Sequence, residues 1–447
     1  RWENYKGFVD TNVVTLKPIT ILLGANGSGK TSVLQPFLLL KQTLDKADKA
    51  IALMTTGDYV NSGSYYDMVS DHAITSKIKF FFEFPYALTQ YKRRPKIGAV
   101  PPTKVKFTFS VNDDSNPILH SLECWDCYDR PMLSRELQPD GTYNLNFFSK
   151  IEDHREHNVQ SIHGHRPRRF LFDNNDVVEE FFSYGNEANS EFRKFEISKS
   201  SSLYLSVVSY VEMRMRRFLR SLKYIGPLRE PPKRFYEFKG DYHSNVGPKG
   251  EFTYSLLKQL TNDSKKEEEL SFWLAKFGLA RKVKCTRIPG HSELMEIKIS
   301  PKTSKVDINF SDACFGVSQL LPILVQSLMA EKEDTIICEQ PEIHLNPNCE
   351  TILADFFVES WVNRKVKFVI ETHSEHYLLR MRTHIKKGLI RNTDVGIYFI
   401  DNSHGHAVLR EIPLDEKGMF KDNSWPKGFL EQALTESLMF ATAKREI

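Results

Sequence analysis

The sequence predicts an α/β protein with a mainly parallel β-sheet, an antiparallel β lobe and a mixed α/β insertion. The apolar run Ile19–Leu23 precedes a glycine-rich turn and a helical pattern from Thr31 to about Leu44, which together are typical of a strand, a loop and a helix. From about residue 77 the chain instead alternates apolar and polar residues, as antiparallel strands do. Near the C-terminal end, three apolar runs are typical of buried parallel strands: Thr335–Cys338, Val366–Ile370 and Val395–Ile400.

Length and composition are consistent with this prediction. The chain has 447 residues, of which 40% are hydrophobic, and its net charge is +4. This content is enough for a substantial core and excludes wholesale disorder. We divide the chain into an N-terminal part of the parallel-sheet domain (1–76), a β lobe with a helical insertion (77–300) and a C-terminal part (301–447). The small net charge neither requires nor forbids binding to nucleic acid.

The sequence also indicates a cytoplasmic protein. No apolar run reaches the roughly 18 residues that span a bilayer, and we expect neither a signal peptide nor a membrane partner. The six scattered cysteines favour a reducing compartment. Cys124 and Cys127 form one CxxC without a second pair, so structural cysteines are favoured over a metal site.

The N-terminal elements follow in order. Trp2–Phe8 is predicted as a strand, and Pro36 is expected to kink the helix that follows the glycines. Alternating residues predict strands at Lys77–Phe84 and Thr103–Val111, with a loop at Tyr91–Lys104 between them.

The middle of the chain contains two predicted helices, Ser201–Leu222 and Lys265–Phe277. The first carries four arginines, which indicate a solvated face more strongly than a nucleic-acid contact. His154–Arg169 is predicted as a polar loop, in which solvated histidines are favoured over metal ligands. No heptad pattern is long enough for a coiled-coil arm. Three more helices are predicted among the C-terminal strands, at about Gly316–Glu331, Asn348–Asn363 and His376–Lys387.

The strongest chemical motif is the run from Gly24 to Thr31, GANGSGKT, between the first apolar strand and its helix. Glycines allow backbone N–H groups to converge on a phosphate at a helix N-terminus. Lys30 is expected to reach the β- and γ-phosphates of a nucleotide and the Thr31 hydroxyl to bind Mg²⁺. The predicted nucleotide contacts are Asn26, Gly27, Ser28, Gly29, Lys30, Thr31 and Ser32.

A second motif, TIICEQPE, ends an apolar strand in carboxylates. Glu339 is expected to orient Mg²⁺ through water, so that Thr31 and Glu339 form the predicted metal site. A following acid, Glu342, would polarise the attacking water. A third strand ends at Glu371-Thr372-His373, where His373 fits a residue that senses the γ-phosphate. The candidate catalytic residues are therefore Glu339, Gln340, Glu342 and His373.

Gly316, Ser318 and Gln319 open a predicted apolar helix. A Gly-x-Ser sequence at this place presents a hydroxyl and backbone N–H groups to a phosphate. The alternative is an ordinary helix cap by Ser318 or Ser311.

Together these motifs resemble the ABC-type ATPases, including the chromosome-maintenance and overcoming-lysogenisation branches. NYKGF, LKP and GANGSGKTS are similar to the first strands and phosphate loop of that branch. EQPEIHLNP resembles its extended Walker B motif and D-loop, ETHS its histidine switch and FGVSQ its signature motif. WPKGF and GPLR are also similar to stand-alone ATPases of antiphage systems such as PARIS and Septu. The predicted fold is thus an ABC-type P-loop ATPase head.

Three departures from the family pattern bear on activity. Gln340 stands where the family usually has a catalytic Glu, and a carboxamide cannot accept a proton from water as a carboxylate does. Hydrolysis is therefore expected to be slow, unless Glu342 or His373 assists. The transporter-type LSGGQ sequence is absent, and no clear Gln-loop occurs near Asn61–Ser64.

The resemblance implies ATP and Mg²⁺ as cofactors and a dimer or higher oligomer, with Gly316, Ser318 and Gln319 acting in trans. It also implies a sensor or scaffold subunit of an antiphage complex, which responds to a phage-encoded trigger or DNA. Its effector, a nuclease, would be supplied by a separate chain. The alternative is a DNA-binding ATPase of repair or chromosome maintenance, which three basic clusters favour, at residues 92–96, 166–169 and 214–220.

Overall fold

The computed structural model describes residues 1–46, 51–85, 101–149, 158–165, 170, 207–238, 240, 242–302, 304–402, 405–421 and 425. The chain forms two compact units. The first unit contains Arg1–Val14, Ser32–Arg220 and Asn402–Val408, and the second contains Thr15–Thr31, Ser221–Asp401 and Leu409–Ile447. The division of the chain at residues 76 and 300 into parts of the parallel-sheet domain and a β lobe stays a prediction.

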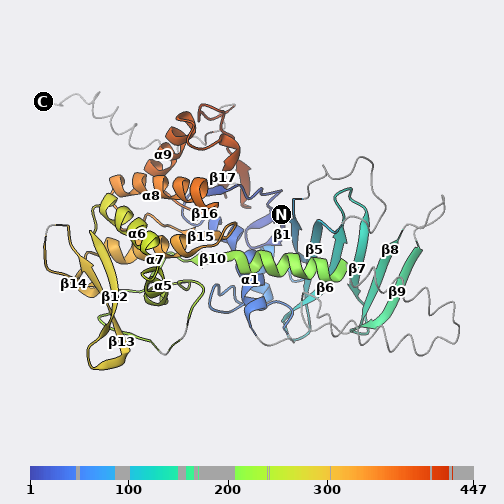
Figure 1. The fold of residues 1–447 in the computed structure, drawn as a ribbon. Coiled ribbons are helices and arrows are strands. Elements are labelled where there is room, and N and C mark those ends of the chain that lie inside the picture. The colour runs from blue at the N-terminus through green and yellow to red at the C-terminus, as the bar shows by residue number, and fades with distance from the viewer. Residues whose placement is uncertain are drawn as a thin grey trace, which may run out of the picture. The chain divides into compact units, whose positions relative to one another are not determined.

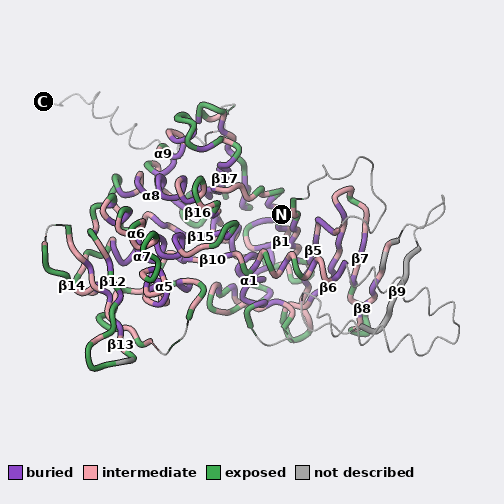
Figure 2. The backbone as a smooth tube through the Cα atoms, viewed as in Figure 1, coloured by how far each residue is buried: buried purple, intermediate pink, exposed green. Residues whose placement is uncertain are grey.

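A six-stranded sheet is the centre of the second unit (Figure 1). Its strands lie in the order β10-β15-β16-β3-β17-β18, and the first five run parallel to one another. All residues of β3 and of β15, the latter labelled in Figure 2, are buried, as continuous apolar runs require. The bounds are β3 Ile19–Gly24, β10 Leu222–Ile225, β15 Thr335–Glu339, β16 Lys367–Glu371, β17 Val395–Asp401 and β18 Val408–Glu411.

Helices of the second unit pack on this sheet, and their N-terminal caps follow from the sequence. Asp263, Asn346 and Ser374 each accept backbone N–H groups at the start of α6, α8 and α9. The helices are α5 Thr253–Leu260, α6 Ser264–Lys276, α7 Phe315–Met329, α8 Pro347–Glu359 and α9 Glu375–Lys386, with short helical turns at Phe310–Asp312, Ser360–Arg364 and Asn392–Asp394.

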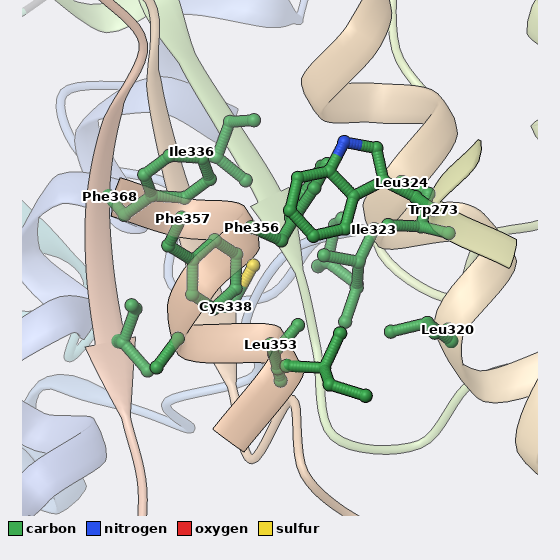
Figure 3. Close-up of a cluster of buried hydrophobic side chains, with 14 of the residues drawn as sticks. Trp273, Leu320, Ile323, Leu324, Ile336, Cys338, Leu353, Phe356, Phe357 and Phe368 are labelled. Carbon is green, nitrogen blue, oxygen red and sulfur yellow. The ribbon is translucent and has the colours of Figure 1, made fainter. Parts of the chain in front are cut away.

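The core of the second unit lies between these helices and the sheet (Figure 3). Trp273 of α6 meets Phe356 of α8 edge to face, with ring centroids 5.0 Å apart. Phe357 of α8 reaches Phe368 of β16, with centroids 4.4 Å apart. These buried aromatic rings pack α6 on α8 and α8 on the middle of the sheet.

A smaller antiparallel sheet also belongs to the second unit. Its order is β11-β13-β12, and β14 pairs with β13. The strands are β11 Tyr236–Glu237, β12 Lys282–Ile288, β13 His291–Ser300 and β14 Ile308–Asn309.

The first unit contains the antiparallel lobe, a single sheet of eight strands in the order β2-β1-β4-β5-β6-β7-β8-β9. Trp2 packs edge to face on both Phe37 and Phe80 in its core. The strands are β1 Trp2–Tyr5, β2 Phe8–Asp10, β4 Ile78–Glu83, β5 Lys104–Val111, β6 Pro117–Trp125, β7 Pro131–Leu137, β8 Tyr143–Ser149 and β9 Asn158–His165. Its helical segments are α2 Tyr65–Met68, Ser70–His72 and residues 207–221. Helix α1, Lys30–Asp45, begins in the second unit and continues in the first.

The predicted α/β class, with an antiparallel β lobe, is therefore confirmed, and two local predictions are corrected. The predicted strand Trp2–Phe8 is a hairpin, because the backbone turns at Lys6, which has a φ of 52°. Part of the predicted loop His154–Arg169 is strand β9, whose backbone pairs with β8 and so overrides its polar sequence. The basic run 166–169, most of the loop Tyr91–Lys104, the first residues of the helix Ser201–Leu222 and the Pro426–Phe429 stretch lie outside the described residues.

All six cysteines are free thiols. In the described part of the chain, no helix is both long and apolar enough to cross a membrane.

Candidate nucleotide-binding site

The residues predicted from the motifs lie at the carboxyl edge of the six-stranded sheet. Glu339 at the end of β15 pairs in register with Glu371 at the end of β16. Glu371 in turn pairs with Leu22 of β3, two residues before Gly24. Because all three strands are parallel, their chemically active ends meet at one edge, where ligands of such sheets bind.

The phosphate loop connects β3 to α1 through glycine conformations that other residues rarely adopt. Gly27 and Gly29 have φ values of 73° and 99°. A Cβ on Gly24 would lie 2.5 Å from the Ile400 carbonyl oxygen and from Ser28 Oγ, so only glycine fits. Asn26 and Gly27 are exposed, and a Cβ on Gly27 would meet open space. This is a backbone cradle into which a phosphate fits.

Lys30, the first residue of α1, is 4% exposed and folds back over the loop. Its ammonium donates hydrogen bonds to the carbonyl oxygens of Gly24, at 3.1 Å, and Ala25, at 2.8 Å. Burial lowers the Lys30 pKa, and the carboxylates of Glu371 and Glu342 oppose this shift. Phosphate oxygens can replace those two carbonyls as acceptors for the ammonium.

Two polar side chains accompany Lys30 in the loop. Ser28 Oγ is buried without a hydrogen-bond partner among the described residues, which is typical of a group that awaits a ligand or water. The Thr31 hydroxyl donates to Glu371 Oε2 at 3.0 Å. Ser32 follows Thr31 in α1 and is partly buried.

Glu339 is 5% exposed and accepts a hydrogen bond of 2.9 Å from the Tyr224 hydroxyl of β10. Burial and the neighbouring Glu371 carboxylate raise the Glu339 pKa to about 7, whereas Tyr224 and Arg229 oppose this shift. Burial likewise raises the pKa of Glu371, which Thr31 and Lys30 counteract. This edge of the sheet thus holds two carboxyl groups, and a nearby cation would stabilise the ionised form of both.

Gln340 has a φ of 44°, a left-handed conformation that is unusual for a residue with a side chain. Arg229, which is 6% exposed, donates from Nη2 to the carbonyl oxygens of Glu339, at 2.9 Å, and Gln340, at 3.3 Å. The Gln340 N–H donates to the Glu371 carbonyl at 2.7 Å. These contacts hold the turn that carries Gln340 at the end of β15.

Glu342 and His373 meet just beyond the strand ends. Glu342 Oε1 accepts the His373 backbone N–H at 2.8 Å, and Glu342 Oε2 is buried without a partner among the described residues. Burial raises the Glu342 pKa. Burial, together with the charge of Lys30, lowers the His373 pKa, so the imidazole is neutral near pH 7.

Residues of the predicted signature stand at the start of α7. Ser318 is 3% exposed, and its hydroxyl donates to the Phe315 carbonyl oxygen at 2.7 Å. Gln319 is 2% exposed and donates to Ser318 Oγ at 3.4 Å. Gly316 is partly buried and Phe315 exposed. The Ser318 hydroxyl is thus bonded within its own helix, and its role in trans stays a prediction.

The oxygen-rich donor set suits Mg²⁺, which prefers carboxylate, hydroxyl and phosphate oxygens and keeps several waters. No group of three or more His, Cys, Asp or Glu residues in the described ranges could hold a metal alone. A metal here would therefore combine oxygens of Thr31 and the nearby carboxylates with those of a bound nucleotide.

Tyr224, Arg229 and Glu371 were not among the predicted site residues. The GPLR stretch was noticed only as a resemblance, and Glu371 only as a neighbour of His373. For Glu371 the sequence does contain a signal, an ionisable residue at the end of an apolar strand, since such a position is costly without a partner.

One comparison with known protein families bears on the class of activity. An AAA ATPase domain family matches residues 170–378, less than half of the chain, and these residues exclude the phosphate loop. Residues 390–438 match a family described as a protein of unknown function, DUF3696. No curated protein matches the chain. The first match supports an ATPase.

Among solved structures, the chain is similar to heads of SMC proteins. These are an SMC head bound to the C-terminal winged-helix domain of ScpA (10% identity, TM-score 0.39, covering 93% of this chain and 97% of that chain), the SMC head of Thermotoga maritima (11%, 0.35, 93% and 97%) and an SMC head with an extended coiled coil bound to the C-terminal domain of ScpA from Pyrococcus furiosus (12%, 0.37, 98% and 98%). The strand order of the chain itself, and not this distant likeness, establishes the fold.

Proposed function

We propose that the chain is an ABC-type ATPase that binds Mg²⁺–ATP at the carboxyl edge of the six-stranded sheet and hydrolyses it slowly. The observation that carries this proposal is the contact between Thr31 of the phosphate loop and Glu371, beside Glu339 in register on the next strand. It brings the glycine cradle, the ammonium of Lys30 and two acidic strand ends to one place.

Each residue has a part in this chemistry. The loop backbone and Lys30 bind the β- and γ-phosphates, and Lys30 exchanges its carbonyl acceptors for phosphate oxygens. Thr31 and Glu339 would hold Mg²⁺, which neutralises phosphate charge when it is bound. Glu342 and the neutral imidazole of His373 orient the attacking water and accept its proton, which the carboxamide of Gln340 cannot do.

We further propose that two copies associate through their nucleotide sites, with the N-terminus of α7 facing the phosphates of the partner copy. This part rests on the resemblance of FGVSQ to a signature motif. Since the Ser318 hydroxyl already bonds to Phe315, its contact with a phosphate requires that this bond be exchanged.

For the cellular role, we propose an ATP-gated sensor or scaffold in an antiphage complex, whose effector nuclease is a separate chain. The resemblance to stand-alone defence ATPases supports it. The competing role is DNA repair or chromosome maintenance. It is favoured by four arginines in the helical residues 207–221, which are Arg214, Arg216, Arg217 and Arg220.

The experiment is purification with the proteins encoded beside this one, for wild type and Lys30→Ala, with measurement of ATP binding, ATP turnover and co-elution. Slow turnover, a co-eluting neighbour and loss of ATP binding in Lys30→Ala support the proposal. Strong stimulation of turnover by DNA without a co-eluting protein supports the repair role. Unchanged ATP binding by Lys30→Ala refutes the nucleotide site.

A further inference from the structure

Glu371 occupies an unusual place in the sheet. It is the last residue of β16, which lies between the strand that carries Glu339 and the strand that leads into the phosphate loop. The residue is 5% exposed. Burial of an unpaired carboxylate costs free energy, so the partners of Glu371 indicate its role.

The partners of Glu371 belong to the phosphate loop. Its Oε2 atom accepts the hydroxyl hydrogen of Thr31 at 3.0 Å, and the charge of Lys30 stabilises its ionised form. Glu339, in contrast, accepts its hydrogen bond from Tyr224 on β10, the strand on the side of β15 that faces away from β16. The carboxylate in contact with the loop hydroxyl is therefore Glu371.

This contact matters because of the way a hydroxyl binds a cation. The oxygen of Thr31 can give a lone pair to Mg²⁺ only if its hydrogen points elsewhere, toward an acceptor. Acceptors of this kind orient the groups that touch a metal, and their loss typically lowers metal affinity about 10- to 100-fold. Glu371 Oε2 already holds that hydrogen.

We propose that Glu371 is a positioning residue of the nucleotide site, which fixes the Thr31 hydroxyl with its lone pairs directed at Mg²⁺. The inference rests on the proposed function and adds a residue to it. The rival role is a latch that holds the loop shut without nucleotide. If Glu371 were a latch, its contact with Thr31 would compete with ATP, and removal of the carboxylate would tighten ATP binding. If Glu371 is a positioning residue, removal of the carboxylate weakens only the ATP binding that depends on Mg²⁺.

The test is the affinity of the full chain for ATP, measured by titration calorimetry in Mg²⁺ and again in EDTA. The variant is Glu371→Met, which keeps the length of the side chain and removes both carboxylate oxygens that could accept the Thr31 hydrogen. Thr31→Val provides a second route, because it removes the hydroxyl and leaves the carboxylate. The matched control is Glu411→Met on β18, where Glu411 pairs with Lys17 at 2.9 Å.

We expect Glu371→Met to lose about tenfold in affinity in Mg²⁺ and less than twofold in EDTA. Thr31→Val should lose at least as much, and the double variant no more than Thr31→Val alone, because the two groups act as one unit. Glu411→Met should match wild type in both buffers.

Three results would overturn the inference: unchanged affinity of Glu371→Met in Mg²⁺, tighter binding, or an equal loss in Mg²⁺ and EDTA, which would indicate an effect on loop shape alone. The EDTA affinity also reports whether each variant is folded. Wild type that binds no ATP would overturn the proposed function itself, a result distinct from wild-type binding with an unaffected Glu371→Met.

Discussion

Replacement of Tyr224 by Phe should shift the pH dependence of Mg²⁺–ATP binding upward. The substitution removes one hydroxyl, which donates to Glu339 Oε1 at 2.9 Å, and leaves the ring in place. A hydrogen bond to a charged group is worth about 1.5–3 kcal/mol. At about 1.36 kcal/mol per pKa unit, its loss raises the Glu339 pKa by about one to two units.

The effect on Mg²⁺–ATP binding depends on the pKa of Glu339 in the wild type. Glu339 has a pKa raised to about 7 by burial and by Glu371. At pH 7.5, about three quarters of wild-type molecules carry Glu339 ionised. In Tyr224→Phe this fraction falls to between about 3% and a quarter. Because Mg²⁺ prefers the carboxylate, Mg²⁺-dependent affinity should fall about 3- to 25-fold at pH 7.5 and recover above pH 9.

The assay is ATP binding by calorimetry from pH 6 to pH 9.5, in Mg²⁺ and in EDTA, with Tyr236→Phe on β11 as the control. The control should show the wild-type profile. The reasoning is refuted if Tyr224→Phe keeps the wild-type midpoint in Mg²⁺, or if the same shift appears in EDTA.

Three further predictions concern neighbouring residues. Arg229→Met should lower turnover about tenfold and change the free energy of unfolding by less than about 2 kcal/mol. The substitution removes two hydrogen bonds to carbonyls, but it also removes two buried nitrogen atoms, Nε and Nη1, that have no hydrogen-bond partner among the described residues. A large loss of stability in a urea titration would contradict this balance. Gln340→Glu should raise single-turnover hydrolysis about 10²-fold by supplying a general base, and an unchanged rate would show that Gln340 is not limiting. Without nucleotide or Mg²⁺, the free energy of unfolding of the wild type should fall by up to about 3 kcal/mol relative to that of Glu339→Gln as the pH rises from 4.5 to 7. The reason is that a carboxyl group with a raised pKa stays protonated in the folded protein and ionises in the unfolded chain. An equal pH dependence of the free energy of unfolding in both proteins, measured by urea denaturation, would contradict this prediction.

The phosphate loop could be predicted because its information is local. Glycines, Lys30 and Thr31 lie within eight residues between an apolar strand and a helix, and hydrogen bonds within the loop shape it. The parallel strands were also predictable, since full burial leaves a continuous apolar run. Strand β9 was missed for the opposite reason, because backbone pairing with β8, and not the pattern of its own residues, makes it a strand.

The sequence by itself determined which chemical groups are available: a glycine loop with a lysine and a threonine, acidic strand ends and a histidine. Only the tertiary structure decided which groups meet. Strand register places Glu371, and not Glu339, on the Thr31 hydroxyl, and it brings Tyr224 to Glu339 from more than a hundred residues away in the sequence. The physical reason is that register and strand order arise from packing and backbone pairing between distant segments, which no local pattern encodes.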